Sequence, residues 1–180
     1  PGEAVSHVGA GTGYYSAIRS RLVLPGGRVH AFEIEPELAE RARRSLAAYP
    51  VIVVTGDAVK LPLPASDIIY VNAGVAAPPA SWLQALKPGG RLIFPWRPSK
   101  EVALSVLVTR REAGFEAKPL MPSWFIPCIG AAFAGAKAKL PDREEARRSR
   151  SIWIATDRPP DDTATAIIGD VWFSSEPLKE

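Results

Sequence analysis

Four residues near the start of the chain have the types and the spacing of a cofactor site: Gly9, Gly11, Gly13 and Glu33. The three glycines stand at alternate positions and directly follow a short apolar run, residues 5–8. Glycine tolerates positive φ, and because it has no Cβ it lets the backbone approach a ligand closely. An acid at the end of the next strand can accept hydrogen bonds from the two hydroxyls of a ribose. The pattern predicts a turn that holds a cofactor at the carboxyl end of a strand.

The spacing of the glycines indicates which cofactor. The dinucleotide fingerprint is G-x-G-x-x-G, whereas this chain has G-x-G-x-G with a helix starting directly after it. The compact form resembles the turn of S-adenosylmethionine (SAM) methyltransferases, where no pyrophosphate has to lie at the helix N-terminus. An ordinary glycine-rich turn is the alternative. Glu33, twenty residues after Gly13, favours the cofactor site.

Two acids compete for the ribose position. Glu33 ends the run 28–32, and Glu35 follows two residues later. Alternation along the strand directs Glu35 elsewhere, so we assign the ribose to Glu33. A solvated surface acid, the usual fate of a glutamate, is the alternative for Glu33.

The elements that must position these residues alternate between β and α patterns. We expect helices over 14–24, 37–48 and 78–86, strands over 28–33, 51–55, 67–71 and 91–95, and a hairpin of two long β segments, 102–111 and 115–128. This order predicts an α/β doubly wound, Rossmann-like sheet that is mostly parallel, with an antiparallel last strand inserted from the C-terminal hairpin.

Two further polar residues follow strands of this sheet. Asp57 lies in a loop, where its carboxylate could accept from an adenine amino group while the N–H of Ala58 meets a ring nitrogen. The alternative is that Asp57 only caps a turn. Asn72 could bind the methionine part of SAM or merely close a loop.

Composition limits the class of protein. With 180 residues, 47% of them apolar, the chain suits one globular domain, and its net charge of +3 is too small to indicate a nucleic-acid partner. The lone Cys128 has no disulfide partner and no metal-ligand spacing around it, so we expect a buried thiol and no metal. No apolar run approaches the ~20 residues that span a bilayer, so we expect a soluble, cytoplasmic protein with no membrane partner. Because the chain starts at Pro1 and enters a strand at once, we also expect an upstream part outside this sequence.

Longer segments resemble one methyltransferase family. HVGAGTGYYSA, AFEIEPELAERAR, VVTGDA, SDIIYVNAGVAAPP and LKPGGRLIFP, in that order, look like the protein-L-isoaspartate O-methyltransferase family of class I SAM methyltransferases. The resemblance covers roughly residues 4–131, and its more specific parts are PPASWLQALKPGGRLIFP and FIPC. It implies methyl transfer from SAM to the carboxylate of an L-isoaspartyl residue in a peptide or protein, the first step of repair.

The resemblance also implies roles for single residues. It places Gly9, Gly11, Glu33 and Asp57 in contact with SAM, and Ala10, Ile34 and Ala58 along the adenosine. One departure is His7, which stands where many class I methyltransferases carry an acid for the methionine ammonium; a core histidine is the alternative. The other is that the family's segment before the first strand, which bears much of the peptide groove, has no counterpart here. We therefore expect cofactor binding, with slow or no turnover.

The predicted chemistry needs few catalytic side chains. A carboxylate is already a nucleophile and a methyl sulfonium already carries a leaving group, so the protein has to align them and exclude water. We nominate no general base.

The last part of the chain lies outside the resemblance. We expect a SAM-binding core over 1–131 and an extension over 132–180 that packs on the same domain, with a basic helix over 137–151 and a strand over 151–155. A run of charged residues of this kind usually forms a solvated face of the protein. Two other functions stay open: an RNA methyltransferase that uses residues 137–150 to bind phosphates, and a SAM-binding module without catalysis.

Overall fold

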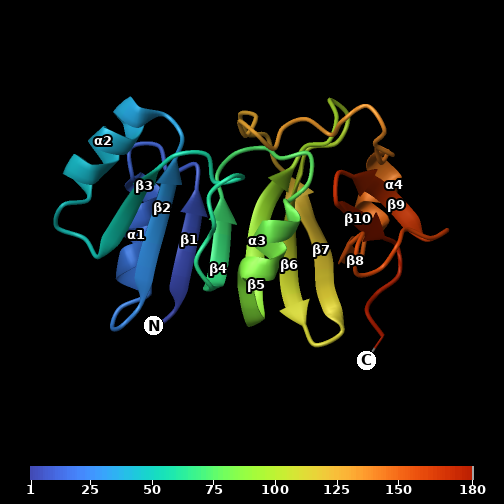
Figure 1. The fold of residues 1–180 in the computed structure, drawn as a ribbon, viewed down its shortest axis with the longest axis horizontal. Coiled ribbons are helices and arrows are strands. Elements are labelled where there is room, and N and C mark those ends of the chain that lie inside the picture. The colour runs from blue at the N-terminus through green and yellow to red at the C-terminus, as the bar shows by residue number, and fades with distance from the viewer. Residues whose placement is uncertain (180) are drawn as a thin grey trace.

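The first half of the chain alternates strands and helices in the computed structural model, which describes residues 1–179 (Figure 1). Its elements are β1 (Ala4–Val8), α1 (Tyr14–Leu22), β2 (Arg28–Glu33), α2 (Pro36–Ser45), β3 (Val51–Thr55), β4 (Ser66–Val71), α3 (Ala80–Ala85) and β5 (Leu86–Trp96). Pro36 opens α2, because a proline at the first helical position gives up an N–H that would have no partner there.

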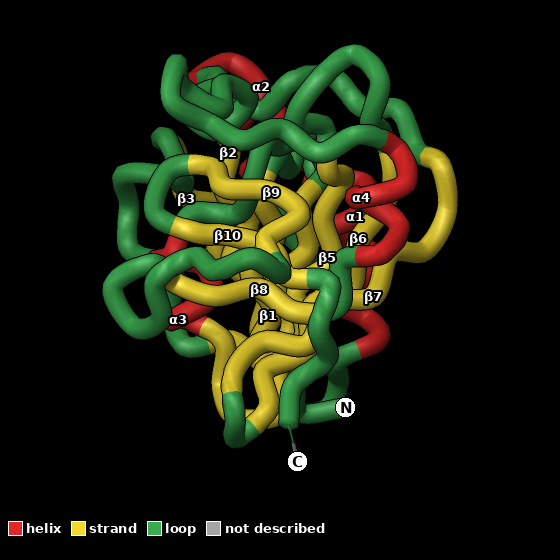
Figure 2. Tube along the Cα trace, turned by 90° about the vertical axis from the view of Figure 1, so that its right-hand side faces the viewer, coloured by secondary structure: helices red, strands yellow, loops and turns green. Residues whose placement is uncertain are grey.

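Antiparallel strands dominate the second half. Its elements are β6 (Leu104–Arg111), β7 (Gly114–Pro122), α4 (Arg143–Arg148), β8 (Ser151–Ile154), β9 (Ala164–Ile168) and β10 (Val171–Ser174). Figure 2 shows β8, β10 and β9 at the near end of the molecule. The chain enters β10 through a two-residue turn, Gly169–Asp170, in which Gly169 has φ +62°.

All ten strands form one sheet in the order β3-β2-β1-β4-β5-β6-β7-β8-β10-β9. The strands from β3 to β5 are parallel, and every pairing from β5 to β9 is antiparallel. The predicted fold class is therefore confirmed: a doubly wound, mostly parallel core that continues into an antiparallel hairpin. The hairpin is not inserted between earlier strands, however, since β6 and β7 extend the sheet in chain order.

The extension after residue 131 differs from its prediction. The expected helix over 137–151 is only α4, because Pro141 interrupts the pattern and Asp142 caps the helix, accepting from the N–H groups of Glu144 and Glu145 at 2.8 Å. The predicted strand over 151–155 is confirmed as β8. The apolar stretch that follows it forms the hairpin of β9 and β10.

Large aromatic side chains fill the core on the face of the sheet that α3 covers. Trp82, Phe94 and Trp96 are fully buried there, and Phe173 of β10 stacks on Trp96 with ring centroids 4.0 Å apart. On the other face, Val5, Val23 and Val29 form a smaller cluster. The stacking joins the C-terminal strands to the same core as the first five. Within residues 1–179, no helix has both the length and the apolar character needed to cross a membrane.

Candidate functional site

A cavity of about 240 Å³ lies where β1, β2 and β4 end, the edge at which the sequence predicted a cofactor. Most of the predicted site residues line it: Gly9, Gly11, Glu33, Ile34, Asp57, Ala58 and Asn72. The exceptions are His7, Ala10 and Gly13. Residues at the ends of different parallel strands thus meet in one place, as the fold requires.

The glycine turn has the backbone conformation that its sequence predicted. Gly9, Gly11 and Gly13 have φ values of +76°, +57° and +94°. A Cβ added at Gly11 would meet nothing within 4 Å, whereas one at Gly13 would lie 2.7 Å from the side chain of Leu46. Gly13 therefore serves the packing of the turn against the end of α2, while Gly11 leaves space open toward the cavity. Ala10 is buried behind the turn, and its N–H donates to Phe32 O at 3.0 Å.

Glu33 is a buried carboxylate that is tied to this turn. Its Oε2 accepts from the N–H of Gly11 at 2.7 Å, and its Oε1 accepts from the N–H of Glu35 at 3.1 Å. Only 6% of Glu33 is exposed, so the solvated surface acid is not what the structure contains. A carboxylate offers about four lone-pair positions, and these two bonds leave one acceptor position on each oxygen. Glu35 is exposed at the rim of the cavity.

Asp57 both caps a turn and lines the cavity. Its Oδ1 accepts from the N–H of Val59 at 2.9 Å, and its Oδ2 lies 3.6 Å from the exposed ammonium of Lys60. Ala58 is held from the opposite side, since its carbonyl accepts from the indole N–H of Trp82 at 3.0 Å. Asp57 thus lies where it can both cap the turn and accept a hydrogen bond from a ligand in the cavity.

Asn72 follows β4, directly beside the glycine turn. Its N–H donates to Val8 O at 2.8 Å, which closes the end of the strand, and it also lines the cavity. The backbone carbonyl of Asn72 would lie 3.6 Å from a Cβ added at Gly9. That distance is an ordinary van der Waals contact, so it is the φ of +76° that favours glycine at position 9.

A segment that the sequence placed in a β strand instead crosses over the cavity. The second predicted β segment, 115–128, ends as a strand at Pro122, and Ile126–Ile129 line the cavity. The segment is held by Gly74, whose N–H donates to Ile126 O at 2.7 Å and whose carbonyl accepts from Cys128 N at 2.8 Å. Pro122 and Pro127 are the sequence signals that could have ended the strand earlier.

The thiol of Cys128 is buried in the wall of this cavity, as predicted. Burial raises its pKa to about 11, and the negative charges of Asp57 and Glu33 act in the same direction. The thiol therefore stays protonated at neutral pH and is a poor nucleophile.

His7 lies in the core under α1, outside the cavity lining. Its Nδ1 lies 2.7 Å from Ser16 Oγ, and its ring is 5.3 Å from that of Tyr70. Burial lowers the pKa of His7 to about 3, and the nearby charge of Arg19 adds to the shift. Its Nε2 has no hydrogen-bond partner among the described residues. This is the position that the core-histidine alternative describes, although one ring nitrogen is unsatisfied.

The chain is similar to proteins of one methyltransferase family. The family model described as protein-L-isoaspartate(D-aspartate) O-methyltransferase (PCMT) matches residues 1–132. Proteins named protein-L-isoaspartate O-methyltransferase from Hyperthermus butylicus and Aeropyrum pernix are 37% and 40% identical to the chain, over 143 and 136 residues. Both alignments cover 72% of this chain, but 59% and 52% of the relatives. The chain thus spans between about half and six-tenths of their length.

Two solved structures share the fold. One, described as a protein-L-isoaspartate O-methyltransferase, superposes with a TM-score of 0.69 at 22% identity and covers 96% of this chain and 63% of its own. The other is a Plasmodium falciparum protein described as a protein-L-isoaspartate O-methyltransferase in complex with S-adenosyl-L-homocysteine. It superposes with a TM-score of 0.62 at 18% identity, and the match covers 71% of this chain and 66% of that protein. The resemblance predicted from the motifs is confirmed by the family match: the chain belongs to the protein-L-isoaspartate(D-aspartate) O-methyltransferase family.

Proposed function

We propose that the chain binds SAM in the cavity at the ends of β1, β2 and β4 and transfers its methyl group to the carboxylate of an L-isoaspartyl residue in a polypeptide. The observation that carries this proposal is the meeting of Gly11, Glu33 and Asp57 in one cavity of a chain of this family. The names of its relatives, and the S-adenosyl-L-homocysteine bound in the Plasmodium falciparum protein, support the same assignment.

The residues around the cavity suit the parts of SAM. The two acceptor positions left on Glu33 suit the two ribose hydroxyls. Asp57 can accept from the adenine amino group, and the N–H of Ala58, which has no acceptor within the described residues, can meet a ring nitrogen. Ile34 and Ile129 offer apolar walls to the base. Asn72 and the open space beside Gly11 remain for the methionine part.

The chain's part in the reaction is to position the reacting groups and to remove water from around them. SAM, when bound, would supply a methyl group on a positively charged sulfur. The isoaspartyl carboxylate would form a C–O bond to this methyl group as its C–S bond breaks, S-adenosyl-L-homocysteine would leave, and no proton would be lost. No general base is therefore needed, and alignment of the reacting atoms supplies the rate. Ile126–Ile129 line the cavity, and their apolar side chains would help to exclude water from a bound substrate. The neutral thiol of Cys128 does not compete as a nucleophile.

The RNA methyltransferase alternative is not favoured by the family of the chain. Its basic residues, including Arg147 and Arg150, lie along a separate hollow rather than at the cavity. The module without catalysis differs from our proposal only in turnover, so an activity measurement separates the two.

The test is radiolabelled methyl transfer to an isoaspartyl peptide, run beside the same peptide with normal aspartate. We expect slow transfer, with label on the isoaspartyl peptide alone. Calorimetric titration with S-adenosyl-L-homocysteine on the same preparation reports cofactor binding separately. Cofactor binding with no transfer to either peptide would overturn the proposed activity and leave the SAM-binding module, and transfer to both peptides alike would overturn the isoaspartyl specificity.

A further inference from the structure

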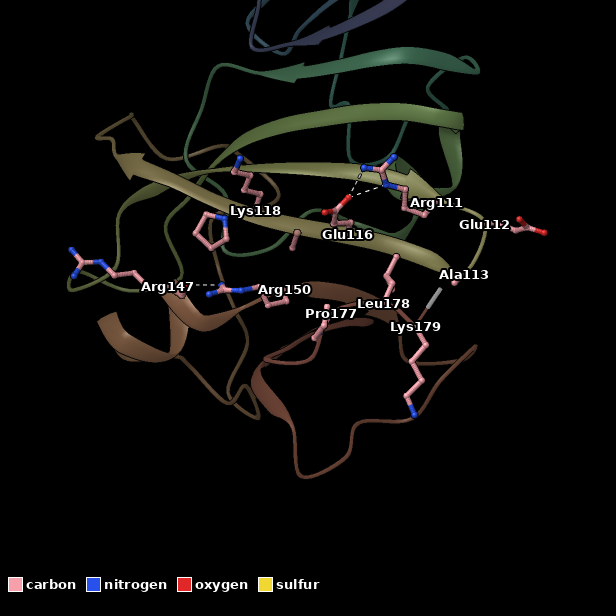
Figure 3. A pocket seen from close by; sticks show the side chains of 12 residues that line it. Arg111, Glu112, Ala113, Glu116, Lys118, Arg147, Arg150, Pro177, Leu178 and Lys179 are labelled. Atoms are coloured by element: carbon pink, nitrogen blue, oxygen red, sulfur yellow. Dashed lines mark hydrogen bonds and ion pairs between the residues drawn. The ribbon is translucent and has the colours of Figure 1, made fainter.

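A groove outside the cofactor cavity follows the outer edge of β7. Its two parts enclose about 1150 and 340 Å³ and share Pro119 and Arg147 among their lining residues. In Figure 3, which draws the larger part, β7 lies along one side, and Arg147 and Arg150 together with Pro177 and Leu178 lie on the other. None of this lining is shared with the cavity at the ends of β1, β2 and β4.

The charge of the groove is unbalanced. Arg111 and Glu116 neutralise each other in a salt bridge of 2.7 Å. The other charged lining residues are the cations Lys118, Arg143, Arg147, Arg150 and Lys179 and the acids Glu101 and Glu112, none of which takes part in an ion pair within residues 1–179. This excess of unpaired cations over unpaired acids along the groove attracts an anionic partner.

Much of the uncharged lining of the groove is apolar. Ala117 and Leu178 line the larger part, and the smaller part adds Leu120, Met121 and Trp124, all three of which are well exposed. Exposed apolar side chains next to unpaired cations suit a polypeptide that carries both acidic and apolar side chains. A nucleic-acid backbone would use the cations and leave most of these apolar contacts unused.

The edge of β7 explains why the groove stays open to side chains. β7 pairs with β8 only at Phe115 and Glu116, and the N–H of Ala117 then donates to Arg150 O at 2.7 Å. Pro119, two residues further along the same edge, has no N–H to offer to another strand. A partner is therefore held by its side chains and its charge, rather than by strand addition.

The groove also leads to the proposed active site. Trp124 lines its smaller part, and Ile126, two residues later, lines the cofactor cavity. Arg97 holds this connection, since it donates to Phe125 O at 2.8 Å and its guanidinium lies 5.6 Å from the ring of Trp124. A peptide that lies along β7 as far as Trp124 would therefore end beside the segment that lines the cavity.

We infer that the groove along β7 binds an acidic, partly apolar stretch of the polypeptide substrate, at a distance from the residue to be methylated. That this polypeptide is a substrate rests on the proposed function. The binding of acidic polypeptide does not, because it requires neither SAM nor turnover.

The test is fluorescence anisotropy with a fluorescein-labelled 12-residue peptide of alternating glutamate and leucine, without SAM, against the full chain. We expect binding that weakens as salt rises from about 50 to 500 mM, because rim charges are screened. Arg147→Glu should weaken it roughly tenfold. Arg148→Glu is the matched control: Arg148 is the next residue of α4, is also exposed, and lines neither part of the groove. We expect it to change the affinity less than about twofold.

Three outcomes would overturn the inference. One is an equal effect of the two substitutions, and another is equal binding of a peptide in which lysine replaces glutamate. The third is Arg147-dependent binding of a single-stranded RNA oligonucleotide with none of the acidic peptide, which would assign the groove to nucleic acid. Failure of methyl transfer, measured separately, would leave the peptide result standing.

Discussion

The carboxylate of Glu33 accepts a hydrogen bond from the backbone N–H of Gly11 at 2.7 Å, across the carboxyl ends of two neighbouring strands. The acid that we assign to the ribose is thus also the acid that fixes the glycine turn. Because Glu33 is only 6% exposed, removing its carboxylate would leave the partly buried N–H of Gly11 without its acceptor and would also remove the proposed ligand contact.

Replacing Glu33 should therefore affect both binding and stability. We expect Glu33→Gln to weaken the binding of S-adenosyl-L-homocysteine by roughly 1–3 kcal/mol and to lower the melting temperature, since charged acceptors make the stronger hydrogen bonds. Isothermal titration and thermal unfolding measure the two effects. Glu37→Gln, an exposed acid in the first turn of α2 that does not line the cavity, is the control. Equal affinities of the two variants would remove Glu33 from the site.

Substitutions at Gly11 and at Gly13 should have different effects. Gly11→Ala should cost about 1 kcal/mol of unfolding free energy, the price of a left-handed φ with a Cβ. Gly13→Ala should cost roughly 1–3 kcal/mol more, because its Cβ would meet Leu46 at 2.7 Å. Urea unfolding measures both. Gly11→Val should abolish cofactor binding by filling the space beside the turn, and tight binding by a folded Gly11→Val protein would place the cofactor elsewhere.

His7 should make the protein sensitive to acid. Its pKa is lowered to about 3 in the folded state from an ordinary value of 6.5, so the unfolded chain takes up its proton first as the pH falls. The folded state therefore keeps its full stability above about pH 6.5 and loses it progressively between 6.5 and 3. Between pH 7.5 and pH 5 the loss from this group is about 2 kcal/mol.

Denaturant unfolding at both pH values checks this expectation. His7→Asn, which retains a side-chain amide near Ser16, should lose about 2 kcal/mol less than the native sequence over that interval. The pKa of His30 is also lowered by burial, but His30 is present in both proteins and cancels in the comparison. Identical pH dependence in the two proteins would show that His7 does not control it.

The C-terminal strands should be inseparable from the core. Phe173→Ala removes the ring that stacks on Trp96 and should cost roughly 3–5 kcal/mol. Unfolding should remain a single transition when it is followed by tryptophan fluorescence and by circular dichroism. Phe133→Ala, at a residue that is 86% exposed, should stay within about 0.5 kcal/mol of the native protein. Two separated transitions would instead define residues 132–180 as an independent unit.

The parts of the site that the sequence predicted are those in which neighbouring residues carry the signal. The glycine turn and Glu33 belong to one β-α-β unit, whose hydrophobic pattern and spacing give both the turn and the strand end. Asp57 follows from the same reasoning at the next strand. Each of these depends on contacts within the parallel half of the sheet, which a regular alternation of strands and helices specifies.

The parts that the sequence did not predict depend on contacts between distant segments. Ile126–Ile129 reach the cavity through their bonds to Gly74, and no periodic pattern connects the two stretches. For His7, β1 is buried on both faces, so alternation alone did not say which side of the strand faces the cofactor. In the basic segment, the run of charged residues suggested a helix over 137–151, whereas the helix in the structure, α4, begins after its cap at Asp142.

The position of β1 has a consequence for how the chain folds. β1 lies inside the sheet, and Val5 pairs with its second neighbour, Ile68, only after two helices and two more strands have passed along the chain. Closing that long loop costs entropy before any contact rewards it, so folding is slow compared with helical proteins. Until β4 pairs with it, β1 has one unpaired edge, and the opposite edge of the β3-β2-β1 sheet is β3, in which every residue from Val51 to Thr55 is β-branched. Such strands pair readily with other copies, so refolding yield should fall as protein concentration rises.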